Sequence, residues 1–228
     1  MDIKDLNLEK IEKYDLQIYQ DDRFFKFGVD AFCLAEFTKR FVKKKGRYID
    51  LCSGTGVVGI IVSKLLDLDL AYFVELNPYY VQVNDLNIRT NGLVGEVINE
   101  DIRNLPYILD GYSFDFITIN PPYMAASRGL HTSNIHKDLA KIEPDDKFLE
   151  DVFKVSHALL NDKGQLFMVH RVERLADIFI AARENRMEPK TIQYIRNKGS
   201  RKASLVLIRF VKNGNVFLDN LDDYEIGG

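Results

Sequence analysis

The sequence predicts an α/β domain built on a doubly wound, mostly parallel sheet that ends in an antiparallel hairpin. Short apolar runs alternate with stretches of helical periodicity, as in successive βαβ units. A glycine loop follows the first apolar run of the central region. The last two apolar runs are joined too tightly for a helix between them, so we expect them to pair as a hairpin. A length of 228 residues with 46% apolar content suits one domain with a short extension.

Seven strands are expected along the central and C-terminal parts of the chain, at 48–51, 71–74, 96–99, 114–119, 165–170, 191–196 and 204–211. The run 114–119 is apolar at nearly every position, which is typical of a parallel strand covered on both faces. Helices are expected at 29–42, 57–66, 78–91, 147–160 and 173–186. Pro78 and Gly92 mark the ends of the third helix, and Asp30 is expected to help cap the first.

Two parts of the chain are distinguished at residue 46. Residues 1–46 are an N-terminal extension with one expected helix, and residues 47–228 are the main domain. No apolar run is long enough to span a bilayer, and the N-terminus lacks a signal-peptide core. Cys33 and Cys52 have no paired spacing, and the four histidines have no metal-type spacing, so we expect a cytoplasmic protein without a metal.

Charge is unevenly distributed along the chain. The formal net charge of −3 argues against a protein that coats nucleic acid through a global positive field. Residues 190–212, however, carry seven lysines and arginines and no acidic residue. This basic segment includes the turn of the expected hairpin and is a candidate local surface for a nucleic acid.

The glycine loop runs from Asp50 to Gly59 between an expected strand and an expected helix. Such a loop also suits NAD or FAD, but Asp50 would repel a pyrophosphate, whereas it favours the ammonium and sulfonium of S-adenosylmethionine. Glu75 ends the next strand, where an acid accepts hydrogen bonds from ribose hydroxyls. Asp101 follows the third strand and suits the adenine amine. Three acids at successive strand ends therefore predict S-adenosylmethionine as the cofactor.

The tetrapeptide Asn120-Pro121-Pro122-Tyr123 directly follows the strand 114–119. An exocyclic amine on a nucleobase is a poor nucleophile because its lone pair is delocalised into the ring. The side-chain carbonyl of Asn120 and the backbone carbonyl of Pro121 are expected to accept both amine hydrogens and localise that lone pair. Tyr123 offers a flat ring on which an extruded base can stack. The tetrapeptide predicts methylation of a planar nitrogen without an obligatory base.

With these residues in view, the chain resembles the bacterial tRNA(Val) adenine-N6 methyltransferases, which modify the adenosine at position 37, immediately 3′ of the anticodon. Four segments carry the resemblance: 20–30, the glycine loop, the tetrapeptide, and 170–175 together with 198–203. The resemblance implies the seven-stranded, Rossmann-like fold of class I S-adenosylmethionine-dependent methyltransferases for residues 47–228. It also implies that the N-terminal extension packs beside the cofactor site.

The resemblance and the motifs together give a set of candidate site residues. The cofactor-binding candidates are Phe27, Asp30, Asp50, Cys52, Ser53, Gly54, Gly56, Glu75, Leu76, Asp101, Ile102 and Asn120. The catalytic candidates are Asn120, Pro121, Pro122 and Tyr123, and the RNA-binding candidates are Arg171, Arg174, Lys198, Arg201 and Lys202. The segment 125–142 is expected to order over the target base.

The sequence departs from the resembled family at one point, and three alternative functions remain open. Relatives tend to have arginine and histidine where this chain has Lys141 and Ile142, which bears on substrate details. A protein glutamine N5-methyltransferase uses the same tetrapeptide but carries a longer N-terminal domain. A ribosomal RNA guanine-N2 methyltransferase is often twice as long. A catalytically silent RNA-binding protein predicts an eroded glycine loop or tetrapeptide, and neither is eroded here.

Overall fold

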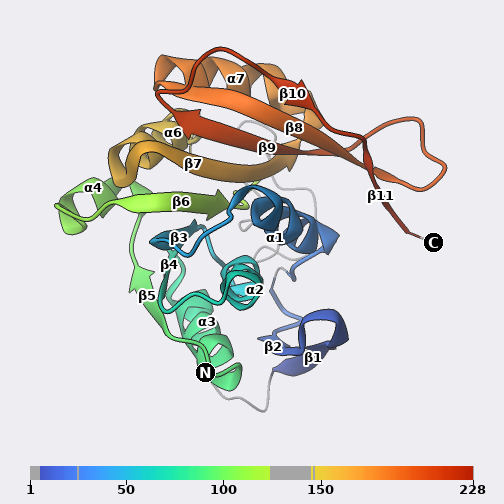
Figure 1. The fold of residues 1–228 in the computed structure, drawn as a ribbon. Helices are drawn as coiled ribbons and strands as arrows, with labels where there is room; N and C mark the ends of the chain where they lie inside the picture. The colour runs from blue at the N-terminus through green and yellow to red at the C-terminus, as the bar shows by residue number, and fades with distance from the viewer. Residues whose placement is uncertain (1–5, 25, 124–144, 146, 228) are drawn as a thin grey trace.

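A mostly parallel sheet forms the centre of the molecule in the computed structural model of the chain (Figure 1). The structure describes residues 6–24, 26–123, 145 and 147–227. In this described part the strand order is β10-β8-β9-β7-β6-β3-β4-β5, and β11 also pairs with β8. The seven expected strands are all present, as β3 (Tyr48–Leu51), β4 (Ala71–Glu75), β5 (Gly95–Asn99), β6 (Phe114–Ile119), β7 (Leu160–Arg171), β8 (Met187–Asn197) and β9 (Leu205–Lys212).

The C-terminal hairpin is confirmed. Strand β9 lies antiparallel between β7 and β8, whereas β3 to β7 pair in parallel. Strand β7 begins at Leu160, five residues before the expected start. Residues 161–164 are polar or glycine, and they form a register shift opposite Phe114 and Phe116. The polar residues of this bulge interrupt the apolar run, so the sequence predicted a strand that begins too late.

Helices cover both faces of the sheet (Figure 1). They are α1 (Val29–Phe41), α2 (Val57–Leu66), α3 (Pro78–Thr90), α4 (Leu105–Ile108), α6 (Phe148–Leu159) and α7 (Leu175–Glu184), with short 3₁₀ turns at Glu12–Tyr14, Ile102–Asn104 and Val172–Arg174. The start of α3 follows its expected signals, because Asn77 caps the Tyr79 amide at 2.9 Å and Pro78 lies in the first turn. Gly92 follows the helix with a φ of 63°.

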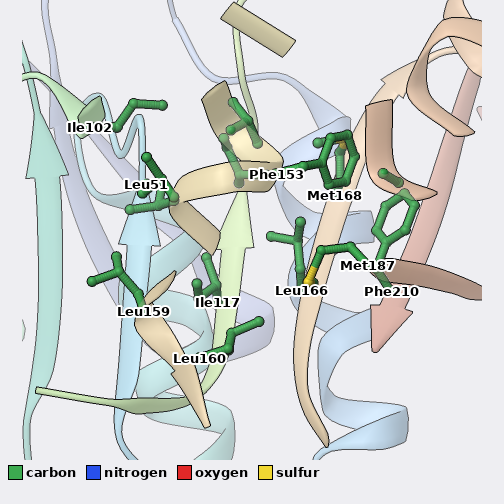
Figure 2. Packing of buried hydrophobic residues seen from close by; sticks show 14 of the residues in the cluster. Leu51, Ile102, Ile117, Phe153, Leu159, Leu160, Leu166, Met168, Met187 and Phe210 are labelled. Carbon is green, nitrogen blue, oxygen red and sulfur yellow. The ribbon is translucent and has the colours of Figure 1, made fainter. Parts of the chain in front are cut away.

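Each face of the sheet packs its own hydrophobic cluster. On one face, Phe153 of α6 meets Phe210 of β9 edge to face with ring centroids 5.0 Å apart, and Figure 2 shows both rings beside Met168 and Met187. On the other face, helices α1 and α2 cover the sheet, and Phe37 of α1 packs against Phe167 of β7. Apart from the exposed Asp115, the residues of β6 are buried, which explains why the strand is mostly apolar.

The N-terminal extension holds more structure than the single helix expected there. Strands β1 (Asn7–Ile11) and β2 (Leu16–Gln20) form an antiparallel hairpin before α1. The outer edge of β2 pairs with side chains of α3 and of its C-cap residue instead of a strand. Asn91 and Asn87 each accept a backbone amide of β2, at 2.8 and 2.7 Å, and each donates to a carbonyl of the same strand. The two strands of the hairpin pair with each other, and the alternation of buried Leu16 and Ile18 with Gln17 and Tyr19 is a local signal of β2; only the outer edge of β2 depends on residues far along the chain.

The C-terminal tail adds two short strands, β10 (Asp219–Asn220) and β11 (Tyr224–Ile226), beside β8. The tail is acidic, and it reaches the basic segment predicted from the sequence. Arg196 pairs with Asp223 at 2.9 Å and also with Glu225. Among the helices of the described residues, none has the length and apolarity needed to cross a membrane.

Candidate active site

A cavity of about 700 Å³ opens at the carboxyl ends of the parallel strands, where ligands of open α/β sheets bind. Its volume falls within the roughly 300–1,000 Å³ typical of small-molecule sites. The candidate residues that line it are Phe27, Asp30, Asp50, Cys52, Ser53, Gly54, Glu75, Leu76, Asp101, Ile102, Asn120, Pro121, Pro122, Tyr123 and Arg171. One cavity therefore contains both the glycine loop and the tetrapeptide.

The glycine loop is held in an unusual backbone conformation between β3 and α2. Cys52, Gly54 and Gly56 all have positive φ angles, of 54°, 53° and 85°. Gly56 does not line the cavity. It lies against α3, where a Cβ atom would come within 2.2 Å of Asn84 Oδ1. Asn84 in turn donates to the Ser53 hydroxyl at 2.9 Å. The loop therefore keeps its backbone open toward the cavity, and Gly56 allows α3 to support it.

Asp50 is the penultimate residue of β3 and is buried next to this loop. Its carboxylate accepts the Gly59 amide of α2 at 3.1 Å and the Thr118 hydroxyl of β6 at 2.5 Å. The Tyr48 hydroxyl lies 2.5 Å from Thr118, so a hydroxyl chain leads into the carboxylate. Burial raises the pKa of Asp50 to about 7, against the opposing effect of these hydrogen bonds. A cation in the cavity would favour the ionised form.

Glu75 and Asp101 also line the cavity. Glu75 accepts the Gly54 amide at 2.9 Å and the Asn77 amide at 2.8 Å, so it braces the loop. Burial raises the pKa of its carboxyl above the usual value. Asp101 accepts the Arg103 amide at 3.0 Å and caps the 3₁₀ turn Ile102–Asn104. Both acids therefore have structural partners in addition to facing the cavity.

The tetrapeptide meets the N-terminal extension. The Asn120 amide nitrogen donates to Asp30 Oδ2 at 3.1 Å, and the Tyr123 hydroxyl lies 2.7 Å from the same oxygen. The Tyr123 hydroxyl also contacts Asn120 Oδ1. The expectation that Asp30 caps α1 is wrong: Gly28 is the N-cap residue, no side chain caps it, and the Asp30 carboxylate bonds to the tetrapeptide instead.

The ring of Tyr123 packs edge to face against His170, with centroids 5.4 Å apart, and the Arg171 guanidinium lies 6.0 Å from its centroid. His170 is buried, and burial lowers its pKa to about 4. A neutral imidazole thus backs the tyrosine ring, and the exposed Arg171 lies at the cavity lining.

The five RNA-binding candidates do not form one cluster. Arg171 lines the cavity, whereas Arg174 pairs with Asp177 at 2.8 Å with its side chain only 19% exposed. The remaining three lie on the turn that joins β8 to β9 and are exposed; in the described part of the chain their side chains make no ion pair. They are Lys198, Arg201 and Lys202. The basic segment 190–212 is thus partly neutralised, since Arg196 pairs with the acidic tail.

Several residues at the site were not predicted from the sequence. Thr118 bridges Asp50 to Tyr48, and its only signal is that it is the polar residue within an otherwise apolar half of β6. Tyr80, Phe148, Ser204 and Leu205 also line the cavity. They follow no motif, and only the fold brings them there. The expected lid over 125–142, with Lys141 and Ile142, lies outside the described residues.

Solved structures define the class of protein to which this fold belongs. The chain is similar to a predicted O-methyltransferase from Agrobacterium tumefaciens (20% identity, 87% of this chain and 89% of that chain, TM-score 0.66). It is also similar to the M. jannaschii tRNA m1G37 methyltransferase (12%, 92% and 58%, 0.63) and to M. jannaschii TYW2 in complex with AdoMet (15%, 91% and 87%, 0.59). The fold is the Rossmann-like fold of S-adenosylmethionine-dependent methyltransferases.

The model of the methyltransferase small domain matches residues 30–181, so the chain belongs to that family. S-adenosylmethionine is the cofactor of this class. Among the curated proteins nothing matches the chain.

Proposed function

We propose that this protein transfers a methyl group from S-adenosylmethionine to the N6 amine of an adenosine in tRNA. The target we propose is the adenosine at position 37 of tRNA(Val). The observation that carries the proposal is that Asn120 and Pro121 line the same cavity as the glycine loop, so a planar nitrogen and a methyl donor fit side by side. The choice of tRNA(Val) rests on the resemblance of segments 20–30, 170–175 and 198–203 to the family that modifies it.

The cavity fits the cofactor by its chemistry. The positive φ angles of the loop leave its backbone open to close approach, and Gly54 has no atom within 4 Å of where a Cβ would lie. Glu75 is proposed to accept the ribose hydroxyls and Asp101 the adenine amine, while Asp50 favours the positive charges. When bound, S-adenosylmethionine supplies a methyl group on a sulfonium, and the sulfur keeps the electron pair of the bond that breaks.

Alignment of the target amine is the main task of the protein residues. Asn120 Oδ1 and the Pro121 carbonyl are proposed to accept the two amine hydrogens, which turns the nitrogen lone pair away from the ring π system. The methylated nitrogen then releases a proton to water, so the reaction needs no catalytic base. Holding the reacting atoms in this geometry accounts for most of the rate gain expected of such a transfer.

The outer part of the cavity suits a nucleic acid. The base of the β8–β9 hairpin, at Ser204 and Leu205, lines the cavity, and its turn extends past the sheet (Figure 1). Lys198, Arg201 and Lys202 on that turn are proposed to contact tRNA phosphates, with Arg171 closer to the target base. A polyanionic substrate explains exposed cations at this edge better than a protein glutamine substrate does.

The test is transfer of label from S-adenosylmethionine to unmodified total tRNA, followed by nucleoside analysis. The proposal expects N6-methyladenosine from valine tRNA at position 37, and labelling at least about a hundredfold slower with the Asn120→Ala variant. Label recovered as N2-methylguanosine from ribosomal RNA, or in a protein glutamine, would assign the site to one of the alternative substrates. No transfer to any of these would contradict the enzymatic proposal.

A further inference from the structure

We propose that Asp30 is a positioning residue that fixes which end of the Asn120 amide meets the target amine. The inference rests on the proposed function, in which Asn120 Oδ1 accepts an amine hydrogen. It differs from the sequence-based expectation that Asp30 binds the cofactor. It also gives the N-terminal extension a part in the chemistry at the tetrapeptide.

The contact is direct and shielded from water. Asp30 is only 7% exposed, and its Oδ2 atom lies 3.1 Å from the Asn120 amide nitrogen and 2.7 Å from the Tyr123 hydroxyl. The carboxylate lies in the first turn of α1, next to Gly28. A Cβ at Gly28 would come within 2.7 Å of Asp30 Oδ1, so the glycine leaves room for the carboxylate.

An asparagine amide can present either its oxygen or its nitrogen to a substrate. The nitrogen would offer two donors to an amine that is itself a donor, and such a pair cannot form the required hydrogen bond. An ionised carboxylate only accepts hydrogen bonds. Asp30 therefore holds the Asn120 nitrogen on its own side and turns Oδ1 toward the other side, where the amine is proposed to bind.

The Asp30 carboxylate also acts on the Tyr123 hydroxyl. Its hydroxyl contacts both Asp30 Oδ2 and Asn120 Oδ1, but a hydroxyl has a single hydrogen to donate. Burial and the nearby Asp30 charge raise the pKa of Tyr123 well above its usual value, so this hydrogen stays in place. When it points to Asp30, the Asn120 oxygen keeps its lone pairs for the substrate.

The experiment compares Asp30→Asn with Glu36→Gln, an acid of the same helix that bonds to Lys13 and Tyr14 away from the cavity. In Asp30→Asn the partner amide can accept or donate, so the orientation of Asn120 is no longer selected. We expect kcat on the wild-type substrate to fall about 10- to 100-fold, as for a misplaced reacting group. The affinity for S-adenosylmethionine, measured by calorimetry, and KM for tRNA should change less than twofold. Glu36→Gln should leave all three unchanged.

Two further measurements separate positioning from a general structural role. The double variant Asp30→Asn/Asn120→Ala should have the kcat of Asn120→Ala alone, because Asp30 acts through Asn120. The side-chain amide signals of Asn120 in a ¹⁵N spectrum, identified by their loss in Asn120→Ala, should shift in Asp30→Asn but not in Glu36→Gln.

The NMR readout requires no substrate, so it stands even if tRNA is not methylated. Unshifted amide signals, additive kcat effects, or a loss of cofactor affinity at unchanged kcat would each overturn the role of Asp30. A wild-type enzyme that leaves tRNA unlabelled while the amide signals shift would instead contradict the proposed function alone.

Discussion

The two halves of the cavity are held in place by different kinds of contact. In the glycine-loop half, formed by Asp50, Gly54 and Glu75, the backbone amides bond to acids close in the chain, and Thr118 also donates to Asp50 from 68 positions away. Glu75 accepts the amide of Gly54, 21 positions away, and Asp50 accepts that of Gly59, 9 positions away. The tetrapeptide half, formed by Asn120 and Tyr123, depends on Asp30, at a separation of 90 and 93 positions. A sequence motif therefore predicts the contacts of the glycine-loop half better than those of the tetrapeptide half.

The largest effect expected from this comparison is at the tetrapeptide. Asn120→Ala removes one oriented acceptor, and we expect kcat to fall by a hundredfold or more, about 2.7 kcal/mol, while cofactor affinity stays nearly unchanged. Single-turnover kinetics and calorimetry measure the two quantities. The control is Asn161→Ala, a half-buried residue outside the cavity lining whose side chain hydrogen-bonds to Asp115, and it should leave both unchanged. Equal loss of cofactor affinity would show that the two halves are not separable.

The next largest effect is expected in the glycine-loop half. Gly56→Ala places a methyl group 2.2 Å from Asn84 Oδ1 at a φ of 85°, so both a clash and backbone strain oppose it. We expect the free energy of unfolding to fall by roughly 1–3 kcal/mol and cofactor affinity to fall with it. Gly199→Ala is the matched control, because it has a φ of 78° but open space around a Cβ.

In the control variant only the strain remains, so its loss of stability should be smaller, and cofactor affinity should be retained. Urea unfolding and calorimetry measure both variants. Equal destabilisation by the two substitutions would contradict the proposed close approach of α3 to the loop.

A third test uses pH to weaken cofactor binding by the glycine-loop half of the cavity. The pKa of Asp50 is raised to about 7, so its charge is lost as the pH falls through 7. Affinity for the cationic cofactor should then fall, by at most about tenfold per pH unit. Ionisation of Asp50 has the opposite effect on the free energy of unfolding. Because the folded pKa lies above the unfolded value, ionisation of Asp50 destabilises the ligand-free protein as pH rises from about 4 to 7. Calorimetric titration between pH 6 and 8 measures the affinity, and an Asp50→Asn variant should show a flatter profile.

The smallest effect is expected on the hairpin turn, outside both halves. Neutralising Arg201 and Lys202 with alanine should weaken tRNA binding and lower the slope of log affinity against log salt by about 1.4, at roughly 0.7 per phosphate contact on single strands. The control is Lys43→Ala/Lys44→Ala, two exposed lysines that precede the amino end of β3, whereas the hairpin turn follows the carboxyl end of β8. Filter binding at several salt concentrations measures both slopes. Identical slopes for wild type and the hairpin variant would remove these cations from the RNA surface.

Much of the fold was predictable because its signals are local. Pro78, Gly92 and the apolar period fixed α3, and the tight link between the last two strands predicted the antiparallel hairpin. The hairpin of β1 and β2 was missed although its strands pair locally, whereas other features that escaped prediction depend on distant partners. Strand β2 pairs with Asn87 and Asn91 side chains, and Asp30 bonds to a tetrapeptide that lies 90 positions later. Neither partner can be inferred from spacing or periodicity in a single sequence.

The side-chain amides along β2 also affect how this protein meets other copies of itself. An unpaired strand edge is a template on which a second chain can add, leading to domain swapping or fibres. Asn87 and Asn91 occupy hydrogen-bonding positions on that edge with groups that belong to a helix and cannot extend into another sheet. At these positions the folded chain offers no free backbone groups to a neighbour, which protects it from edge-to-edge association along β2.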